Sequence, residues 1–194
     1  MTDFEALYKQ HSDPWALGTA WYERRKRSLL LACLPCERYQ CALELGCGTG
    51  DTTMLLAARC QTVQSVDLSE TAIARCRQRL TDDGISNVHA QIMRIPAAWP
   101  DMPIKQADLI VVSELAYYLD DPDLDELLIQ CLQSLAPGGD WLMCHYTDEF
   151  HDRCQNTDKM HAMVDGHPGL KRLVSHGDEH FRLDIWRKHE RGDA

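Results

Sequence analysis

The chain has 194 residues, which suits one globular domain of ordinary size and leaves little room for a second. Hydrophobic residues make up 44% and charged residues 26% of the chain, and these near-average values exclude a disordered chain, a collagen-like repeat and a coiled coil. The formal net charge of -10 opposes binding to a nucleic-acid backbone, so nucleic acid is not an expected partner.

The apolar runs are short, and none approaches the roughly 18 consecutive apolar residues that a membrane-spanning helix needs. The stretch 1–5 carries acids and no apolar run, so it does not resemble a secretory signal. These features predict a cytoplasmic protein with no membrane partner. In a reducing compartment the nine cysteines are expected to stay free, and most lie in apolar runs where Cys packs as a small hydrophobic residue.

Residues 1–40 are rich in aromatic and charged side chains and predict a helical N-terminal segment. Trp15 and Tyr22 precede the basic run 24–27, which leads into the apolar run 28–35. From Cys41 onward the pattern changes. Short apolar runs now alternate with amphipathic stretches, which is typical of βαβ units and a parallel sheet.

Three helices are expected between the strands of this sheet. The first covers 52–59, and the second follows Ser69, whose side chain suits a helix N-cap. The third is expected to begin at Asp123 and to continue until Pro137-Gly138-Gly139 stops it. The apolar runs expected to form parallel strands are 41–45, 62–66, 88–93, 109–112 and 141–144.

Two further strands are expected over 170–175 and 181–187, joined by a short turn at 176–179. Such a hairpin would add an antiparallel edge to the sheet. The chain is therefore expected to form one α/β domain over 1–194.

A glycine-rich turn leaves the first predicted strand, with Gly46, Gly48 and Gly50 separated by single residues and Glu44 in front of them. Glycine lets the backbone turn tightly and lets a ligand lie directly against it. Dinucleotide sites usually have the spacing G-x-G-x-x-G and bind a pyrophosphate, which Glu44 would repel. The same acid can pair with an ammonium group, directly or through water, which suits S-adenosylmethionine because its tail is an amino acid.

Asp67 closes the second predicted strand and is followed by Leu68. An acid at this strand end can accept hydrogen bonds from both hydroxyls of a ribose. The turn alone could be an ordinary loop, but the turn and the acid together in a βαβ context favour a nucleotide-type cofactor.

The segments 44–50, 67 and 108–114 fall in the order of the class I S-adenosylmethionine-dependent methyltransferases, which the sequence resembles. More narrowly it is similar to the nodulation protein S (NodS) family, through Asp13-Pro14-Trp15, Tyr22-Glu23-Arg24 and Tyr117-Tyr118-Leu119. The resemblance implies a Rossmann-like seven-stranded sheet, mostly parallel, with helices on both faces. It also implies an N-methyltransferase that acts on a small-molecule acceptor, an amine or amino sugar. The sequence leaves open whether the protein is a monomer or a homodimer.

The resemblance divides the chain into a helical lid (1–40), a cofactor-binding core (41–145) and a substrate-side helix with the last two strands (146–194). In the lid, Arg24 is available to the cofactor carboxylate, although core packing or a solvated basic face explains each lid residue equally well. After the third strand relatives tend to place Asp near the adenine, whereas this chain has Met93 and Arg94. The expected cofactor contacts are Trp15, Tyr22, Arg24, Glu44, Gly46, Cys47, Gly48, Gly50, Asp67, Leu68, Met93, Arg94 and Ser113.

Methyl transfer from a sulfonium mainly requires that nucleophile, methyl group and sulfur be aligned in a dry pocket. A nearby proton acceptor helps if the nucleophile is an amine that arrives protonated. Candidates follow the fourth and fifth strands, because the carboxyl ends of these strands lie on the cofactor side of the sheet. They are Glu114, Tyr118 and His145, although His145 could equally be a buried polar group with satisfied hydrogen bonds.

Other functional hypotheses are compatible with the sequence. A nicotinamide-dependent oxidoreductase shares the broad fold, but the glycine spacing and Glu44 speak against it. An O- or C-methyltransferase, or a protein that binds S-adenosylmethionine without turnover, would keep the same cofactor motifs. No metal is expected, because Cys33 and Cys36 form a single C-x-x-C without a second pair.

Overall fold

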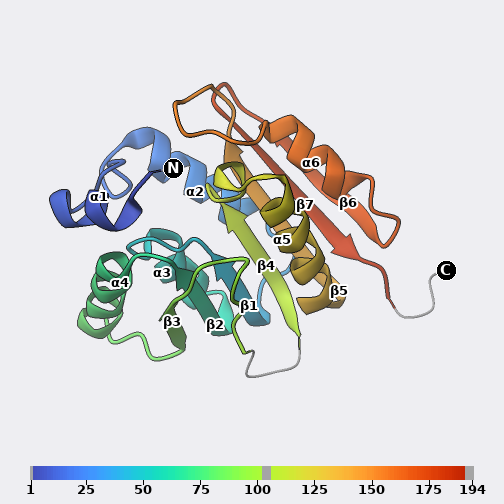
Figure 1. Cartoon of the computed structure of the whole chain (residues 1–194). Helices are drawn as coiled ribbons and strands as arrows, with labels where there is room; N and C mark the ends of the chain where they lie inside the picture. The colour runs from blue at the N-terminus through green and yellow to red at the C-terminus, as the bar shows by residue number, and fades with distance from the viewer. Residues whose placement is uncertain (1, 102–105, 191–194) are drawn as a thin grey trace.

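The computed structural model describes residues 2–101 and 106–190, which form a single sheet flanked by helices (Figure 1). Five strands run parallel to one another, namely β1 (Tyr39–Leu45), β2 (Cys60–Asp67), β3 (Val88–Ile92), β4 (Ala107–Ser113) and β5 (Leu135–Tyr146). β7 (Phe181–Lys188) pairs antiparallel with both β5 and β6 (Leu170–Gly177), so the order is β3-β2-β1-β4-β5-β7-β6. The helices are α1 (Phe4–Gln10), α2 (Trp21–Cys33), α3 (Asp51–Ala57), α4 (Glu70–Asp82), α5 (Asp121–Ser134), α6 (Thr157–Asp165) and the 3-10 turn η1 (Ala116–Tyr118).

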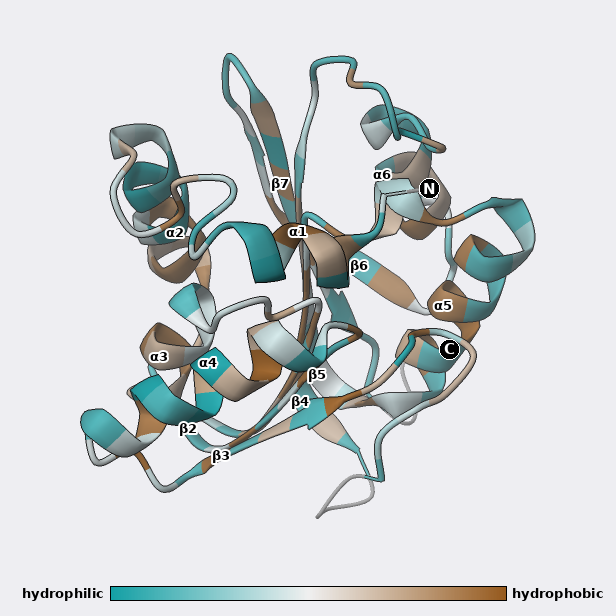
Figure 2. Cartoon of the chain, turned by 60° about the vertical axis from the view of Figure 1, so that its left-hand side comes forward, coloured by the Kyte–Doolittle hydropathy of each residue, from teal (hydrophilic) through white to brown (hydrophobic). Residues whose placement is uncertain are grey.

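Helices cover both faces of the sheet because its central strands are apolar on both sides. Ile110 and Val112 of β4 belong to the core on the side of α5 and α6, whereas Leu109 and Val111 pack on the side of α2 and α3. This alternation follows the two-residue period of a strand, and a strand buried on both faces is continuously apolar. Figure 1 shows α5 and α6 in front of the sheet, and Figure 2 shows hydrophobic residues along the central strands. No helix within the described ranges is both long and apolar enough to cross a membrane.

The predicted fold class is confirmed, since the sheet has seven strands, a parallel part and an antiparallel pair at the C-terminal edge. Ser69 caps α4 as expected, because its hydroxyl accepts a hydrogen bond from the N–H of Ala72.

The predicted boundary between α5 and β5 is wrong. α5 begins at Asp121, two residues earlier than expected, and ends at Ser134 rather than at Pro137-Gly138-Gly139. Residues 135–146 all belong to β5, and Leu135 already pairs with Ala107 of β4. A register shift between Ala107 and Leu109 accommodates the irregular start of β5. Pairing with the neighbouring strand therefore overrides the local stop signal.

The carboxyl ends of β1, β2, β4 and β5 meet at one edge of the sheet, as parallel pairing requires. The N-terminal segment lies across this edge, where α1 contacts α4 (Figure 1). The fold thus brings residues near the N-terminus over the loops that follow the parallel strands.

Replacing Ile110 by Ala is expected to lower the free energy of unfolding by about 3 kcal/mol, because its fully buried side chain fills space between β4 and the helices. Ile129 of α5 offers a matched control, since it is 48% exposed and its replacement by Ala should cost less than about 1 kcal/mol. Urea unfolding followed by circular dichroism measures both variants. Equal losses would contradict the burial of β4 between two helical layers.

Candidate functional site

A cavity of about 710 Å³ opens at the carboxyl edge of the sheet, and its volume lies in the usual range for small-molecule sites. Its walls come from α1, α2, the turn after β1, the ends of β2 and β4, η1 and the loop after β5. Segments that are far apart in the sequence thus enclose one space. The sequence-predicted residues that line it are Trp15, Tyr22, Glu44, Gly46, Cys47, Gly48, Asp67, Leu68, Ser113, Glu114 and Tyr118.

The glycine-rich turn after β1 is fixed by the end of β2. Gly46 and Gly48 have φ values of 78° and 53°, which glycine adopts without a steric penalty. The N–H of Gly48 donates to Asp67 Oδ2 at 2.8 Å, and the N–H of Ser69 donates to Asp67 Oδ1 at 2.9 Å. A Cβ atom at Gly48 would lie 2.6 Å from the Tyr8 hydroxyl oxygen. The turn and the Asp67 carboxylate therefore face the cavity together.

Glu44 lies in β1 shortly before this turn and is 3% exposed. Its Oε2 accepts hydrogen bonds from the hydroxyls of Thr53 at 2.6 Å and Ser65 at 2.8 Å. Burial raises the pKa of Glu44 to about 7. A positively charged group in the cavity would favour the ionised carboxylate.

The Glu5 carboxylate attaches α1 to the N-terminal end of α4. It accepts hydrogen bonds from the Ser69 hydroxyl at 2.6 Å and from the hydroxyl and N–H of Thr71 at 2.7 and 3.1 Å. These bonds lower the pKa of Glu5 to about 2, and the dipole of α4 also favours an anion at this position. α1 is therefore held beside the end of β2.

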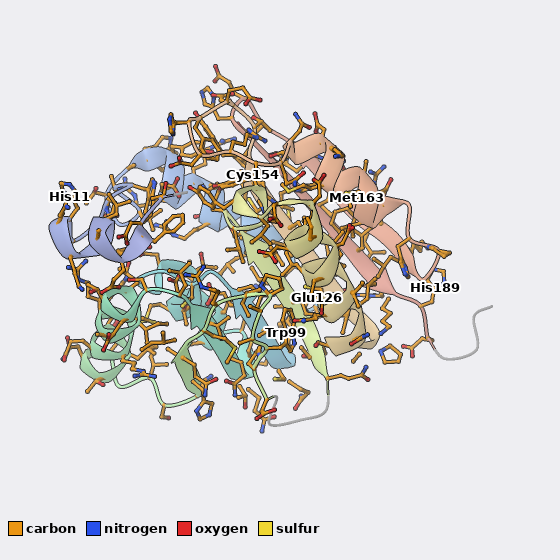
Figure 3. All side chains as sticks on the ribbon, in the orientation of Figure 1. His11, Trp99, Glu126, Cys154, Met163 and His189 are labelled. Atoms are coloured by element: carbon orange, nitrogen blue, oxygen red, sulfur yellow. The ribbon has the colours of Figure 1, made fainter. Side chains whose placement is uncertain are left out.

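Ring contacts join α1 to the opposite wall of the cavity. The Phe4 ring meets Tyr118 edge-on with 4.9 Å between ring centroids, and the Tyr8 ring meets Trp15 with 5.5 Å between them. The N–H of Cys154, which is labelled in Figure 3, donates to the Tyr117 carbonyl at 2.8 Å and ties the loop after β5 to η1. α1, η1 and this loop together enclose the cavity.

A buried ion-pair network joins α2 to the end of β4. Lys26 Nζ lies 2.6 Å from Glu114 Oε1 and 3.0 Å from Glu23 Oε1. Glu114 Oε2 accepts from the Tyr117 hydroxyl at 2.5 Å and from the N–H of Tyr146 at 3.1 Å. Burial opposes the charge of Lys26, but the carboxylates of Glu114 and Glu23 outweigh it and raise the pKa of Lys26 above its ordinary value. Glu114 has a φ of 55°, a strained conformation that persists where several contacts fix a residue.

Arg24, an expected cofactor contact, does not line the cavity. Its guanidinium donates to the Thr19 carbonyl and lies over the Trp21 ring, with 6.0 Å between Cζ and the ring centroid. Arg27 lines the cavity instead and donates to the Leu17 carbonyl at 2.6 Å. The reason is helical periodicity, since the inner face of α2 carries residues 23, 26, 27 and 30.

Met93, Arg94 and Gly50 also lie outside the cavity wall, contrary to expectation. The N–H of Met93 donates to the Asp67 carbonyl at 2.8 Å, its side chain packs against the core, and Arg94 is exposed. Gly50 precedes α3 with a φ of 89°, and a Cβ atom there would lie 2.6 Å from Cys76 Sγ. Gly50 is therefore required for packing rather than for contact with the cavity.

His145, an expected catalytic residue, does not line the cavity, because its side chain is fully buried behind η1. Its Nε2 accepts a hydrogen bond from the N–H of Ala116 at 3.3 Å, and its Nδ1 faces Nε2 of His161 at 3.1 Å. The alternative weighed from the sequence, a buried polar group with satisfied hydrogen bonds, describes it correctly.

Sequence reasoning missed several residues of the wall, among them Tyr8, Lys26, Arg27 and Phe150. Lys26 carried a usable signal, since it stands four residues after Tyr22 on a helix. The other three depend on how the N-terminal segment and the loop after β5 fold back over the sheet.

The nine cysteines are all free thiols, and most of them are buried in the core. Cys33 is the last residue of α2, and Cys36 lies in the turn between α2 and β1. Among the residues that the structure describes, no three His, Cys, Asp or Glu side chains gather into a group that could hold a metal ion.

Residues 42–139 match the methyltransferase domain family. The chain therefore belongs to the methyltransferase domain family, and the expected likeness to class I S-adenosylmethionine-dependent methyltransferases is confirmed.

Within this family the chain resembles nodulation protein S. It is 35% identical over 130 residues to nodulation protein S of Rhizobium tropici, a match that covers 66% of this chain and 52% of the relative. It is 32% identical over 144 residues to that of Bradyrhizobium diazoefficiens, covering 73% of this chain and 66% of the relative. The matches thus span between about half and two thirds of the length of these relatives.

Solved structures agree in fold. The N-methyltransferase NodS of Bradyrhizobium japonicum WM9, in complex with S-adenosyl-l-homocysteine, superposes with a TM-score of 0.82 at 24% identity, covering 96% of this chain and 98% of that chain. A Pseudomonas syringae protein described provisionally as a methyltransferase has a TM-score of 0.75 at 40% identity, covering 87% of this chain and 100% of that chain.

Gly48→Ala is expected to lower the free energy of unfolding by about 2 kcal/mol, because a Cβ atom meets both an unfavourable φ and the Tyr8 hydroxyl. Gly177→Ala in β6 is the matched control, since a Cβ atom there meets nothing within 4 Å. Chemical denaturation measures both variants. Equal stability of the two would refute the described geometry of the turn.

Lys26→Met is expected to cost roughly 3 kcal/mol of stability, because it leaves the Glu114 carboxylate without a cation and leaves Glu23 with only Arg27 Nη1, at 3.8 Å. Adding Glu114→Gln to this variant should recover part of the loss. The control is Lys9→Met, since Lys9 forms an exposed pair with Glu5 at 3.2 Å that is worth less than about 1 kcal/mol. Equal effects of Lys26→Met and Lys9→Met in urea unfolding would rule out the buried network.

Proposed function

We propose that this chain transfers the methyl group of S-adenosylmethionine to a small-molecule acceptor, and that the acceptor atom is the nitrogen of an amine or amino sugar. One observation carries the proposal. The cofactor motif of Glu44, the glycine-rich turn and Asp67 lies in the same cavity as Glu114, Lys26 and the aromatic side chains after β4 and β5. Cofactor and acceptor could therefore meet in one enclosed space.

The cofactor groups each have a matching side chain in the cavity wall. Asp67 accepts one backbone hydrogen bond on each carboxylate oxygen, so each oxygen can accept one more from a ribose hydroxyl. Glu44 would pair with the ammonium group of the amino-acid tail. Arg27, rather than Arg24, would face the carboxylate of that tail, because it lies on the inner face of α2.

The bound cofactor would supply an electrophilic methyl group with sulfur as the leaving group. The chain's own task is to orient the acceptor and to exclude water. Glu114 Oε1 has one partner, Lys26 Nζ at 2.6 Å, and can accept one more hydrogen bond from an acceptor amine. This bond would steer the amine and receive its proton as the new N–C bond forms.

The acceptor end of the cavity is aromatic. Tyr22, Tyr118, Tyr146 and Phe150 line it, and such rings favour both amines and the apolar faces of sugars. The resemblance to nodulation protein S and to the N-methyltransferase NodS supports nitrogen as the acceptor atom.

We also infer that residues 1–40 act as a lid, which the contacts of Phe4, Glu5 and Tyr8 support. In this proposal residues 41–145 bind the cofactor and residues 146–194 complete the acceptor side. The cytoplasmic location and the choice between monomer and homodimer stay predictions.

The test is to incubate the purified chain with S-adenosylmethionine and a panel of amines that includes deacetylated chitooligosaccharides, and to follow product mass and S-adenosylhomocysteine together. A product heavier by one methyl group on nitrogen supports the proposal. Methylation of oxygen or carbon would overturn nitrogen as the acceptor atom. Tight cofactor binding without product across the panel would favour a protein that binds S-adenosylmethionine without turnover.

Asp67→Ala is expected to weaken S-adenosylmethionine binding by about 2 kcal/mol, because two charge-assisted hydrogen bonds to the ribose are lost. Asp82→Ala, at the exposed end of α4, is the control and should leave the affinity unchanged. Isothermal titration calorimetry measures both, and an unchanged affinity in Asp67→Ala would remove Asp67 from the cofactor site.

A further inference from the structure

A chain of hydrogen bonds runs through the core behind the cavity wall. The N–H of Ala116 in η1 donates to Nε2 of His145 in β5 at 3.3 Å. Nδ1 of His145 lies 3.1 Å from Nε2 of His161 in α6, and Nδ1 of His161 lies 2.7 Å from Oδ2 of Asp184 in β7. His145, His161 and Asp184 are all fully buried.

The positions of the protons along these hydrogen bonds follow from the groups at the two ends of the series, the Ala116 N–H and the Asp184 carboxylate. A backbone N–H can only donate, so His145 Nε2 must be the acceptor and the proton of a neutral His145 must be on Nδ1. This proton is donated to His161 Nε2, so His161 also has its proton on Nδ1 and donates it to the Asp184 carboxylate. Despite burial, the hydrogen bond from His161 lowers the pKa of Asp184, which agrees with an ionised acceptor at this end.

An additional proton on either imidazole would break this series of hydrogen bonds. A proton on His145 Nε2 would oppose the N–H of Ala116, and a proton on His161 Nε2 would oppose the N–H of His145. Burial lowers the pKa of both histidines. The neutral forms that these hydrogen bonds require are therefore also the favoured ones.

η1 connects the hydrogen bonds of His145, His161 and Asp184 to the cavity. It carries Tyr118, which lines the cavity, and Tyr117, whose hydroxyl donates to Glu114 Oε2. The Tyr117 ring packs edge-on against His145 with 5.4 Å between ring centroids. Glu114, with its strained φ of 55°, lies two residues before this turn and is joined to it by the hydrogen bond from Tyr117.

We propose that His145, His161 and Asp184 form a positioning relay that holds η1, and through it Glu114 and Tyr118, in one orientation at the acceptor end of the cavity. None of the three lines the cavity, so they are positioning residues. The effect on turnover rests on the proposed function, whereas the arrangement of protons does not.

The direct test of the relay is nitrogen NMR of the full chain labelled with 15N-histidine. Two of the histidines are expected to have a protonated Nδ1 and an unprotonated Nε2 from pH 8 down to roughly pH 6, below the ordinary histidine pKa. Single replacements of His145 and His161 by Phe assign these signals. A proton on Nε2 of either histidine would overturn the relay.

Variants test its effect on turnover. His145→Phe removes the acceptor for Ala116 and is expected to lower kcat at least tenfold, with the dissociation constant for S-adenosylmethionine within twofold of the wild-type value. His145→Gln keeps an acceptor and a donor and is expected to recover most of kcat. His167→Phe, at the end of α6 and outside the relay, is the matched control.

Wild-type kcat in His145→Phe, or equal losses in the Phe and Gln variants, would overturn the positioning role. Circular dichroism shows whether each variant is folded, and if His145→Phe is not, the comparison of wild type with His145→Gln decides. If the wild-type chain methylates none of the acceptors, the proposed function fails, and the NMR result alone decides the relay.

The relay also predicts how stability depends on pH. The unfolded chain takes up protons on both histidines below about pH 6.5, whereas the folded chain does not, so the free energy of unfolding falls as pH drops below that value. This fall should be smaller in His145→Phe, as urea unfolding at pH 7.5 and pH 5.5 would measure, and an equal fall would contradict neutral His145. The charged and titratable groups that face the two imidazoles are Lys26 of α2, Tyr117 of η1, Arg153 of the loop after β5, Asp158 of α6, and Arg182 and Asp184 of β7.

Discussion

The carboxylate of Asp67 holds together the part of the structure on which the site depends. It accepts hydrogen bonds from the N–H groups of Gly48 and Ser69, and so connects the turn after β1 with the start of α4. Because β1 and β2 are adjacent parallel strands, their carboxyl ends are already neighbours. The Asp67 carboxylate only has to fix the distance between the turn after β1 and the start of α4. Tyr8 then packs against the turn at a position where a side chain on Gly48 would collide with it.

The second constraint is electrostatic and acts from the N-terminal side. Lys26 brings a buried ammonium group from α2 to Glu114 at the end of β4. Two carboxylates beside one ammonium group are stable only with close pairing and further partners. Tyr117 and Tyr146 donate hydrogen bonds to Glu114, and Arg27 lies 3.8 Å from Glu23. The same contacts hold α2 against the end of β4, so α2 and the proposed catalytic groups share one network.

The fold and the cofactor side of the cavity could be predicted from the sequence because both follow from local patterns. Apolar runs alternating with amphipathic stretches determine the parallel sheet, and adjacent parallel strands bring Gly48 and Asp67 together. The inward face of α2 could not be predicted, since its charged residues lie all around the helix. The sequence therefore does not distinguish Arg24 from Arg27, which lines the cavity. The burial of His145 depends on His161, which is distant in sequence and reaches it only through the packing of α6 on the sheet.

The end of α5 shows the same limit. Pro137-Gly138-Gly139 has the composition of a helix stop, yet the chain is extended from Leu135 because β4 offers a pairing partner there. Local chemistry determines which conformations are possible for such a segment, whereas neighbouring strands determine which one is adopted.

We propose that one cavity holds the cofactor at Asp67 and directs its methyl group toward Glu114. A crystal structure of the chain with S-adenosylhomocysteine tests this most directly. The ribose hydroxyls are predicted within hydrogen-bond distance of the Asp67 carboxylate, with the sulfur directed toward Glu114 and Tyr118. A ligand bound outside this cavity, or one whose ribose lies away from Asp67, would contradict the claim.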